Sequence, residues 1–116
     1  MHAHDRFHYT ITGAGDMIVV ELAGDLDGCG RDDLQSAIRQ LCAGQGRRVV
    51  LEMSGVSSVD SRGLGALLNV QKVLTDAGRS LFLVGCREPV RHALTLTRLE
   101  VLFRCYPSIA SIPPSA

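Results

Sequence analysis

The sequence predicts a single α/β domain with a mostly parallel sheet. Short apolar, β-branched runs alternate with longer segments whose apolar residues recur at helical spacing, and glycines or prolines separate most of them. A chain of 116 residues with 46% hydrophobic composition can bury one core without metal or disulfide staples. We expect one domain over residues 1–116, with its core at about 7–106 and with flexible or weakly structured ends at 1–6 and 107–116.

The first two strands are expected to form a hairpin. Phe7–Thr12 alternates apolar and polar residues, as a half-buried edge strand does, and Met17–Leu22 is rich in β-branched residues. The segment between them, Gly13–Asp16, suits a common hairpin connection. A loop at Asp25–Gly30 would then lead into the first helix.

The first helix is predicted from one apolar face and from acidic residues near its start. Asp32 and Asp33 would lie in the first turn, where the helix dipole favours negative charge, and Gly44 or Gly46 would end the helix. The apolar face would carry Leu34, Ala37, Ile38, Leu41 and Cys42.

The next strand, Val49–Met53, is almost continuously apolar, which is typical of a parallel strand covered on both faces. A second helix is expected from about Arg62 to Ala77, with Gly78 as its left-handed stop. The packing face of this helix would carry Leu64, Leu67, Leu68, Gln71 and Leu74.

The rest of the chain would complete the alternation. Arg79–Val84 is predicted as a buried strand, Pro89 suits the first turn of a third helix, and Val101–Cys105 would be a last short strand. The third helix would pack through Val90, Ala93, Leu94 and Thr97. The order ββαβαβαβ gathers the loops after the parallel strands on one edge of the sheet. These loops are Asp25–Arg31, Gly55–Arg62 and Gly85–Pro89.

A serine lies at the junction between the Val49–Met53 strand and the second helix. Asp60 and Ser61 are both good N-cap residues, because a short side-chain oxygen accepts from unpaired N–H groups of the first turn. Gly63 and Gly65 follow, although each glycine costs a helix about 1 kcal/mol relative to alanine. A helix start without bulky side chains would let a partner's backbone approach Ser61, and a helix N-terminus stabilises a phosphate.

This junction resembles the signature of STAS domains of the anti-sigma-factor-antagonist type. The matching segment runs from Leu51 to Gly65 and contains Asp-Ser-Arg-Gly-Leu. Val19–Asp27 and Leu81–Gly85 are similar to the second and fourth strands of that family, and Val90–Phe103 resembles the helix and strand that follow. The resemblance covers about residues 8–105 and implies a STAS fold in which Ser61 matches the phosphorylated serine.

The resemblance also implies a function in transcription regulation by partner switching. Unphosphorylated, the protein would bind an anti-sigma factor and free a sigma factor. The anti-sigma factor, itself a serine protein kinase, would phosphorylate Ser61 and release the complex, and a phosphatase would reverse this. The kinase would supply ATP, Mg²⁺ and the catalytic base, so no catalytic residue, cofactor or metal is expected here. The implied partner-binding residues are Asp27, Ser58, Asp60, Ser61, Arg62, Gly63, Leu64, Gly85 and Arg87.

Two positions depart from the family pattern. Arg62 stands where the family commonly has Ser or Thr, and the helix dipole disfavours a cation in a first turn unless it meets an anion. We expect Arg62 to contact an acidic patch on the partner or to fold back on phosphorylated Ser61. The segment Asp27–Gly30 is looser than a direct loop-to-helix entry, which weakens the role implied for Asp27.

A different function within the same family is a non-phosphorylated STAS scaffold subunit of a lipid-transport or stress-sensing complex. The resemblance also leaves room for weak nucleotide binding. The glycine-containing turns, however, lack the spacing of a phosphate-binding loop, which a helix N-terminus follows directly. A receiver domain would need an acidic pair after the first strand and a lysine near the fifth, whereas Lys72 lies mid-helix.

Charge and leader composition argue against nucleic-acid and membrane partners. Twelve basic and twelve acidic residues cancel, so no net field attracts the chain to nucleic acid or an anionic membrane. The start lacks an apolar signal segment, and no run approaches the roughly 20 apolar residues of a membrane helix. We therefore expect a cytoplasmic protein without membrane insertion.

Catalytic and metal-binding residues lack the partners that such sites need. No G-x-S-x-G elbow surrounds Ser61, and His92 has no evident acidic partner, so a hydrolase is not expected. His2, His4 and His8 occupy a terminal segment without the thiols or carboxylates of a metal site. Four cysteines without C-x-x-C spacing favour free buried thiols; they are Cys29, Cys42, Cys86 and Cys105.

Overall fold

The elements follow one another in the expected order ββαβαβαβ, in a computed structural model that describes residues 6–42, 44 and 46–114. Two short 3₁₀ helices are added near the C-terminus. The elements are β1 (His8–Ala14), β2 (Met17–Leu26), α1 (Gly28–Cys42), β3 (Arg48–Val59), α2 (Ser61–Asp76), β4 (Ser80–Val84), α3 (Glu88–Leu96), η1 (Leu99–Leu102), β5 (Arg104–Tyr106) and η2 (Ile109–Ser111). The expectations for His2 and His4 fall outside the described residues.

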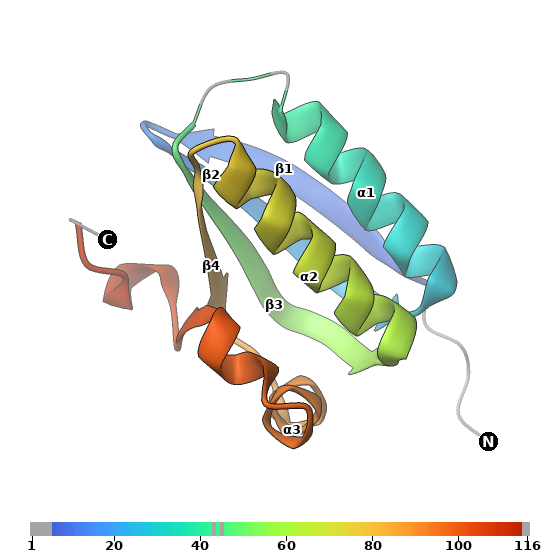
Figure 1. Cartoon of the computed structure of the whole chain (residues 1–116). Helices are drawn as coiled ribbons and strands as arrows, with labels where there is room; N and C mark the ends of the chain where they lie inside the picture. The colour runs from blue at the N-terminus through green and yellow to red at the C-terminus, as the bar shows by residue number, and fades with distance from the viewer. Residues whose placement is uncertain (1–5, 43, 45, 115–116) are drawn as a thin grey trace.

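The five strands form one sheet in the order β1-β2-β3-β4-β5. The β1–β2 pair is an antiparallel hairpin, as expected, and the other neighbours are parallel. From β2 to β5 the strands follow chain order, so right-handed crossovers bring α1, α2 and α3 to the same face, where they share one core cluster. Figure 1 shows α1 and α2 side by side over that face. The three α-helices cover only this face, and the expected cover on the other face of β3 comes from the C-terminal segment.

The main core lies between the sheet and the three helices. Leu51 and Met53 of β3 are fully buried there, and Val90 and Leu94 of α3 join the same cluster. The buried face of α2 differs from the expected leucine stripe, because Leu64 and Leu68 are only half-buried. Its buried residues are Gly63, Ala66, Leu67, Val70 and Leu74.

A second, smaller cluster covers part of the other face of the sheet. Val50 and Phe82 are fully buried on this side, beneath Ile112 from the C-terminal segment, which is 7% exposed. This segment explains why β3 is apolar on both faces although helices cover only one. Ile112 lies beyond the expected core limit at residue 106, because η2 carries the chain back over the sheet.

Two predicted boundaries are wrong near the carboxyl ends of the strands. α1 begins at Gly28, so Asp25–Gly30 is not a loop, and Asp32 and Asp33 lie beyond the first turn. β3 continues to Val59 and pairs with β2 through two register shifts, instead of ending near Met53. Both elements therefore reach the end of the sheet where the candidate site lies.

The last strand is shorter than expected and shifted toward the C-terminus. It runs from Arg104 to Tyr106 beside β4, whereas Val101 and Leu102 belong to η1 and are 79% and 50% exposed. Apolar, β-branched composition alone suggested a strand here, but these two residues precede β5 and do not belong to the sheet.

Candidate functional site

The N-termini of α1 and α2 lie next to each other at one end of the sheet. Leu26, the last residue of β2, pairs with Val59, the last residue of β3. The residues that follow this pair, Asp27 and Asp60, therefore open two neighbouring helices. Figure 1 shows both helices starting at the end toward which β3 points.

Asp27 opens α1 directly. Its carboxylate accepts hydrogen bonds from the backbone N–H groups of Cys29 and Gly30, both at 3.0 Å. Those bonds satisfy donors that a helix start leaves unpaired, which offsets the unfavourable glycines of the first turn. The entry is thus a direct loop-to-helix entry, and the looser arrangement expected for Asp27–Gly30 is wrong.

Asp60 caps α2 and also binds Arg62. Its Oδ1 accepts from the backbone N–H groups of Arg62 at 2.9 Å and Gly63 at 3.0 Å, and its Oδ2 accepts from Arg62 Nη2 at 2.8 Å. Partial burial raises the pKa of the Asp60 carboxyl, but the hydrogen bonds from Gly63 and Arg62 outweigh it, and the net pKa is lowered. Asp60 is therefore a charged cap at neutral pH.

Ser61 is the first residue of α2 and is exposed. It does not cap the helix, because Asp60 occupies that position. Within the described part of the chain, no residue forms a hydrogen bond with the Ser61 hydroxyl. The hydroxyl therefore faces solvent at the N-terminus of α2, between Asp60 and Arg62 in the sequence.

Arg62 bridges the two helix starts. A Cβ placed on Gly28 of α1 would lie 2.6 Å from Arg62 Nη1, so the guanidinium lies against the Gly28 backbone. The hydrogen bond to Asp60 and the charges of Asp60 and Asp27 raise the pKa of Arg62. The cation in the first turn thus meets an anion within the chain, which offsets its unfavourable interaction with the helix dipole.

The two glycines of α2 have different surroundings. A Cβ on Gly63 would collide with the Leu26 carbonyl oxygen, so this glycine allows α2 to pack directly on the end of β2. Gly65 has open space where a Cβ would stand and lies one turn from Ser61 on the exposed face of the helix. Packing within the chain explains Gly63 and does not explain Gly65.

Ser58 lies at the same end of the sheet, in β3. Its hydroxyl donates to Asp25 Oδ1 at 2.7 Å, and Asp25 is only 7% exposed. Our sequence reasoning missed Asp25. An acidic residue between Gly24 and Leu26, at the end of an apolar strand, was the available signal for a buried, hydrogen-bonded carboxylate.

Gly85 and Arg87 lie apart from this cluster. Val84 at the end of β4 pairs with Glu52, and β3 runs on for seven more residues to Val59. A Cβ on Gly85 would approach Glu52 and Ser54, and Arg87 opens α3 without a side-chain cap. Strand pairing thus places Gly85 beside Glu52 and Ser54, whereas Ser61 follows the far end of β3. The structure brings together Asp27, Ser58, Asp60, Ser61, Arg62, Gly63 and the half-buried Leu64.

The described residues hold no group of three His, Cys, Asp or Glu side chains that could bind a metal ion. No helix formed by them is long and apolar enough to cross a bilayer. Cys29, Cys86 and Cys105 are free thiols, but Cys29 and Cys105 are exposed, so the expectation that they are buried is wrong.

Comparison with known proteins places this arrangement in a family. The family model for the STAS domain matches residues 8–112. A curated relative from Thermotoga maritima, named "Putative anti-sigma factor antagonist", is 33% identical over 63 residues, which is 54% of this chain and 56% of that protein. The match thus spans about half the length of the curated relative.

Solved structures share the fold over most of the chain. An anti-sigma factor antagonist from Mycobacterium paratuberculosis aligns with a TM-score of 0.81 and 25% identity, covering 95% of this chain and 93% of that one. The Bacillus cell fate determinant SpoIIAA in its phosphorylated form aligns with a TM-score of 0.68 and 16% identity, covering 90% and 96%. The second likeness concerns the fold alone.

Proposed function

Since the chain belongs to the STAS domain family, we propose that it is an anti-sigma-factor antagonist whose binding is switched by phosphorylation at Ser61. In its unphosphorylated form it binds an anti-sigma factor that is also a serine kinase, and this binding frees a sigma factor in the cytoplasm. Phosphorylation dissociates the complex, and a phosphatase restores the binding form. The protein acts by binding, and the kinase supplies the catalytic groups.

The observation that carries this proposal is the exposed Ser61 hydroxyl at the first position of α2. A kinase can reach it without unfolding the helix, because Asp60 and not Ser61 holds the cap. The open space at Gly65, one turn along the same face, leaves room for a partner's backbone beside the hydroxyl. Ser61 is thus accessible both to a kinase and to a docking partner.

Electrostatics support the switch. A phosphate on Ser61 would add about 1.5 to 2 negative charges beside the Asp60 carboxylate. The nearest helix N–H groups, those of Arg62 and Gly63, already donate to Asp60, so they are not free to bind the phosphate. Arg62 would fold back on the phosphate or remain with Asp60. In either arrangement the docking surface gains negative charge, which should lower partner affinity by about a hundredfold or more.

The direct test is phosphorylation of the purified protein by its cognate anti-sigma kinase with ATP, followed by mass spectrometry. We expect a single phosphate on Ser61 and none on the Ser61→Ala variant. Binding of the kinase, measured by calorimetry without ATP, should be retained by Ser61→Ala and weakened at least tenfold by Ser61→Asp. Asn69→Asp adds the same charge on the exposed face two turns further along α2 and should bind nearly as well as wild type.

Other outcomes would contradict the proposal. Phosphate at another position, with Ser61 unmodified, would remove Ser61 from the mechanism. Equal binding of the Ser61→Ala and Ser61→Asp variants would instead favour a non-phosphorylated scaffold subunit. Arg62→Glu tests the two roles expected for Arg62, because unchanged binding together with normal phosphorylation would rule out both.

A further inference from the structure

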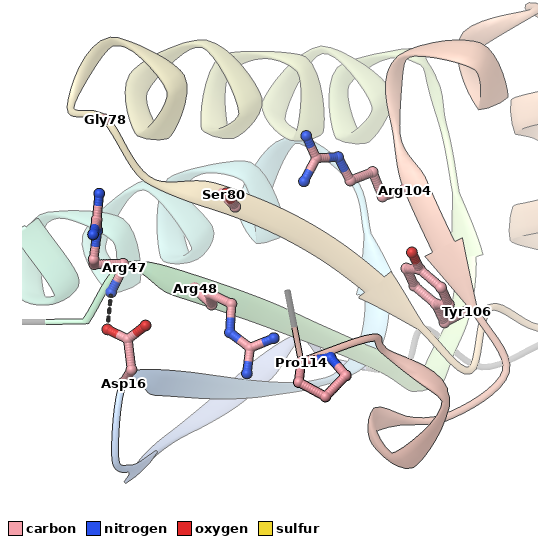
Figure 2. Close-up of a pocket in the computed structure, with 8 residues that line it drawn as sticks. All are labelled: Asp16, Arg47, Arg48, Gly78, Ser80, Arg104, Tyr106 and Pro114. Carbon is pink, nitrogen blue, oxygen red and sulfur yellow. Dashed lines mark hydrogen bonds between the residues drawn. The ribbon is translucent and has the colours of Figure 1, made fainter. Parts of the chain in front are cut away.

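An open cavity of about 830 Å³ lies at the opposite end of the sheet from Ser61. Arg48, at the start of β3, and Ser80, at the start of β4, contribute to it together with residues of β5 and the C-terminal segment. Figure 2 shows the residues that line this cavity: Asp16, Arg47, Arg48, Gly78, Ser80, Arg104, Tyr106 and Pro114. The β3 strand, 12 residues long, separates the cavity from Ser61, and a strand of that length spans roughly 35 Å.

Two of the guanidinium groups are held in place by contacts with the fold. Arg48 Nη1 donates to the Pro113 carbonyl oxygen at 3.1 Å, which ties β3 to the C-terminal segment. The guanidinium carbon of Arg104 lies 5.6 Å from the centre of the Phe82 ring. These contacts leave most of the N–H donors of both side chains available to a ligand.

Among the described residues, no ion pair forms at the arginines of this cavity. Elsewhere in the chain Arg62 and Arg91 form ion pairs with Asp60 and Glu88. By contrast, within residues 6–42, 44 and 46–114, none of the arginines that line this cavity has a carboxylate within 4.0 Å. The carboxylate of Asp16 accepts instead from the Arg47 backbone N–H at 3.1 Å, as Figure 2 shows.

We propose that this cavity binds a small anionic molecule that carries two or more phosphoryl groups. Guanidinium groups match phosphate oxygens in geometry and charge, and the hydroxyls of Ser80 and Tyr106 add neutral donors to the same lining. A cavity of this volume falls in the size range of small-molecule sites, about 300–1,000 Å³, and exceeds what one phosphate fills. The cationic lining is local, because the whole chain has no net charge.

The test uses inorganic pyrophosphate as the probe and the full-length protein. Titration followed by ¹⁵N-resolved NMR at 150 mM salt should give saturable shifts at Ser80, Arg104 and Tyr106. The Arg104→Gln and Arg48→Gln variants should each bind at least about tenfold more weakly, because each loses charge-assisted hydrogen bonds to the ligand. Arg39→Gln removes the same charge from an exposed position on α1 and should bind as wild type does.

The amide spectrum of each variant checks that the fold is intact. Arg104→Gln keeps the hydrogen bond between Arg48 and Pro113, which Arg48→Gln removes. Saturable binding lost in both cavity variants and kept in Arg39→Gln would support the site. Shifts that do not saturate, an equal loss in Arg39→Gln, or shifts that map to the start of α2 would overturn it. The result is independent of the proposed partner switch, because neither kinase nor Ser61 enters the measurement.

Discussion

Cys86 and Cys105 form a thiol pair beside the loop that follows β4. Both line an open cavity of about 450 Å³ together with Gly85 and Arg91. A hydrogen bond from the Cys86 thiol lowers the pKa of Cys105 to about 7, and the same interaction together with burial raises the pKa of Cys86. Cys105 is therefore the more reactive thiol of the pair, because the thiolate is the nucleophile.

The Cys105 thiol should react with iodoacetamide at a rate that rises with pH through a midpoint near 7. In Cys86→Ala the donor is lost, and the midpoint should move up toward the ordinary value of 9.0. Peptide-resolved mass spectrometry of the alkylated protein measures each site separately, and the exposed Cys29 serves as an internal reference for the reagent. A midpoint that is the same with and without Cys86 would show that the pair does not interact.

The two glycines of α2 are expected to respond oppositely to alanine. Gly63→Ala forces a methyl group against the Leu26 backbone, and overpacking of this kind costs about 1–3 kcal/mol of unfolding free energy. Gly65→Ala fills open space and should stabilise the helix by up to about 1 kcal/mol. Urea denaturation of the two variants beside wild type measures both changes.

Gly65→Ala also tests why that glycine is present. If Gly65 leaves room for a partner, the variant should be more stable and yet bind the anti-sigma kinase more weakly than wild type. Tighter folding with unchanged partner binding would mean that Gly65 has no role in docking. Loss of stability in Gly65→Ala, or none in Gly63→Ala, would contradict the packing described for α2.

Strand and helix order were predictable from sequence because apolar periodicity and the glycine stops act locally, as Gly78 with φ of 74° illustrates. The start of α1 was not predictable from propensity, since two glycines in Gly28–Gly30 suggest a loop and the Asp27 cap outweighs them. β3 was similarly cut short, because Ser54–Ser58 resembles a turn but is held by pairing with β2. Elements that depend on a neighbour rather than on composition were the ones misjudged.

The residues of the candidate site likewise divide into those that the local sequence predicts and those that come together only in the folded sheet. Asp60 and Ser61 could be identified from their position before a helix and from the family resemblance. The contact of Arg62 with Gly28 requires the pairing of Leu26 with Val59, which no local pattern specifies. The basic cavity was missed altogether, because its arginines come from segments that are distant in sequence and meet only in the folded sheet.

The molecule as a whole places its two candidate binding sites at opposite ends of one sheet. The starts of α1 and α2 lie beyond the carboxyl ends of β2 and β3, and the basic cavity lies where β3 and β4 begin. A continuous buried core connects α2 to the sheet through Leu67 and Leu74. Charge added at Ser61 therefore acts on a surface that is already formed.

Phosphorylation of Ser61 should consequently change the charge of the docking surface without changing the fold. We expect amide shifts confined to the starts of α1 and α2 in ¹⁵N-resolved NMR of the phosphorylated protein, with Ser80 and Arg104 unmoved. A negative group at a helix start contributes about 0.3–1 kcal/mol, and repulsion from Asp60 opposes it, so the unfolding free energy should stay within about 1 kcal/mol. Shifts that spread through β4 and β5 would instead mean that phosphorylation releases the partner through a conformational change. Confined shifts would leave the local charge at Ser61 as the cause of release, since the rest of the surface would be the same in both states.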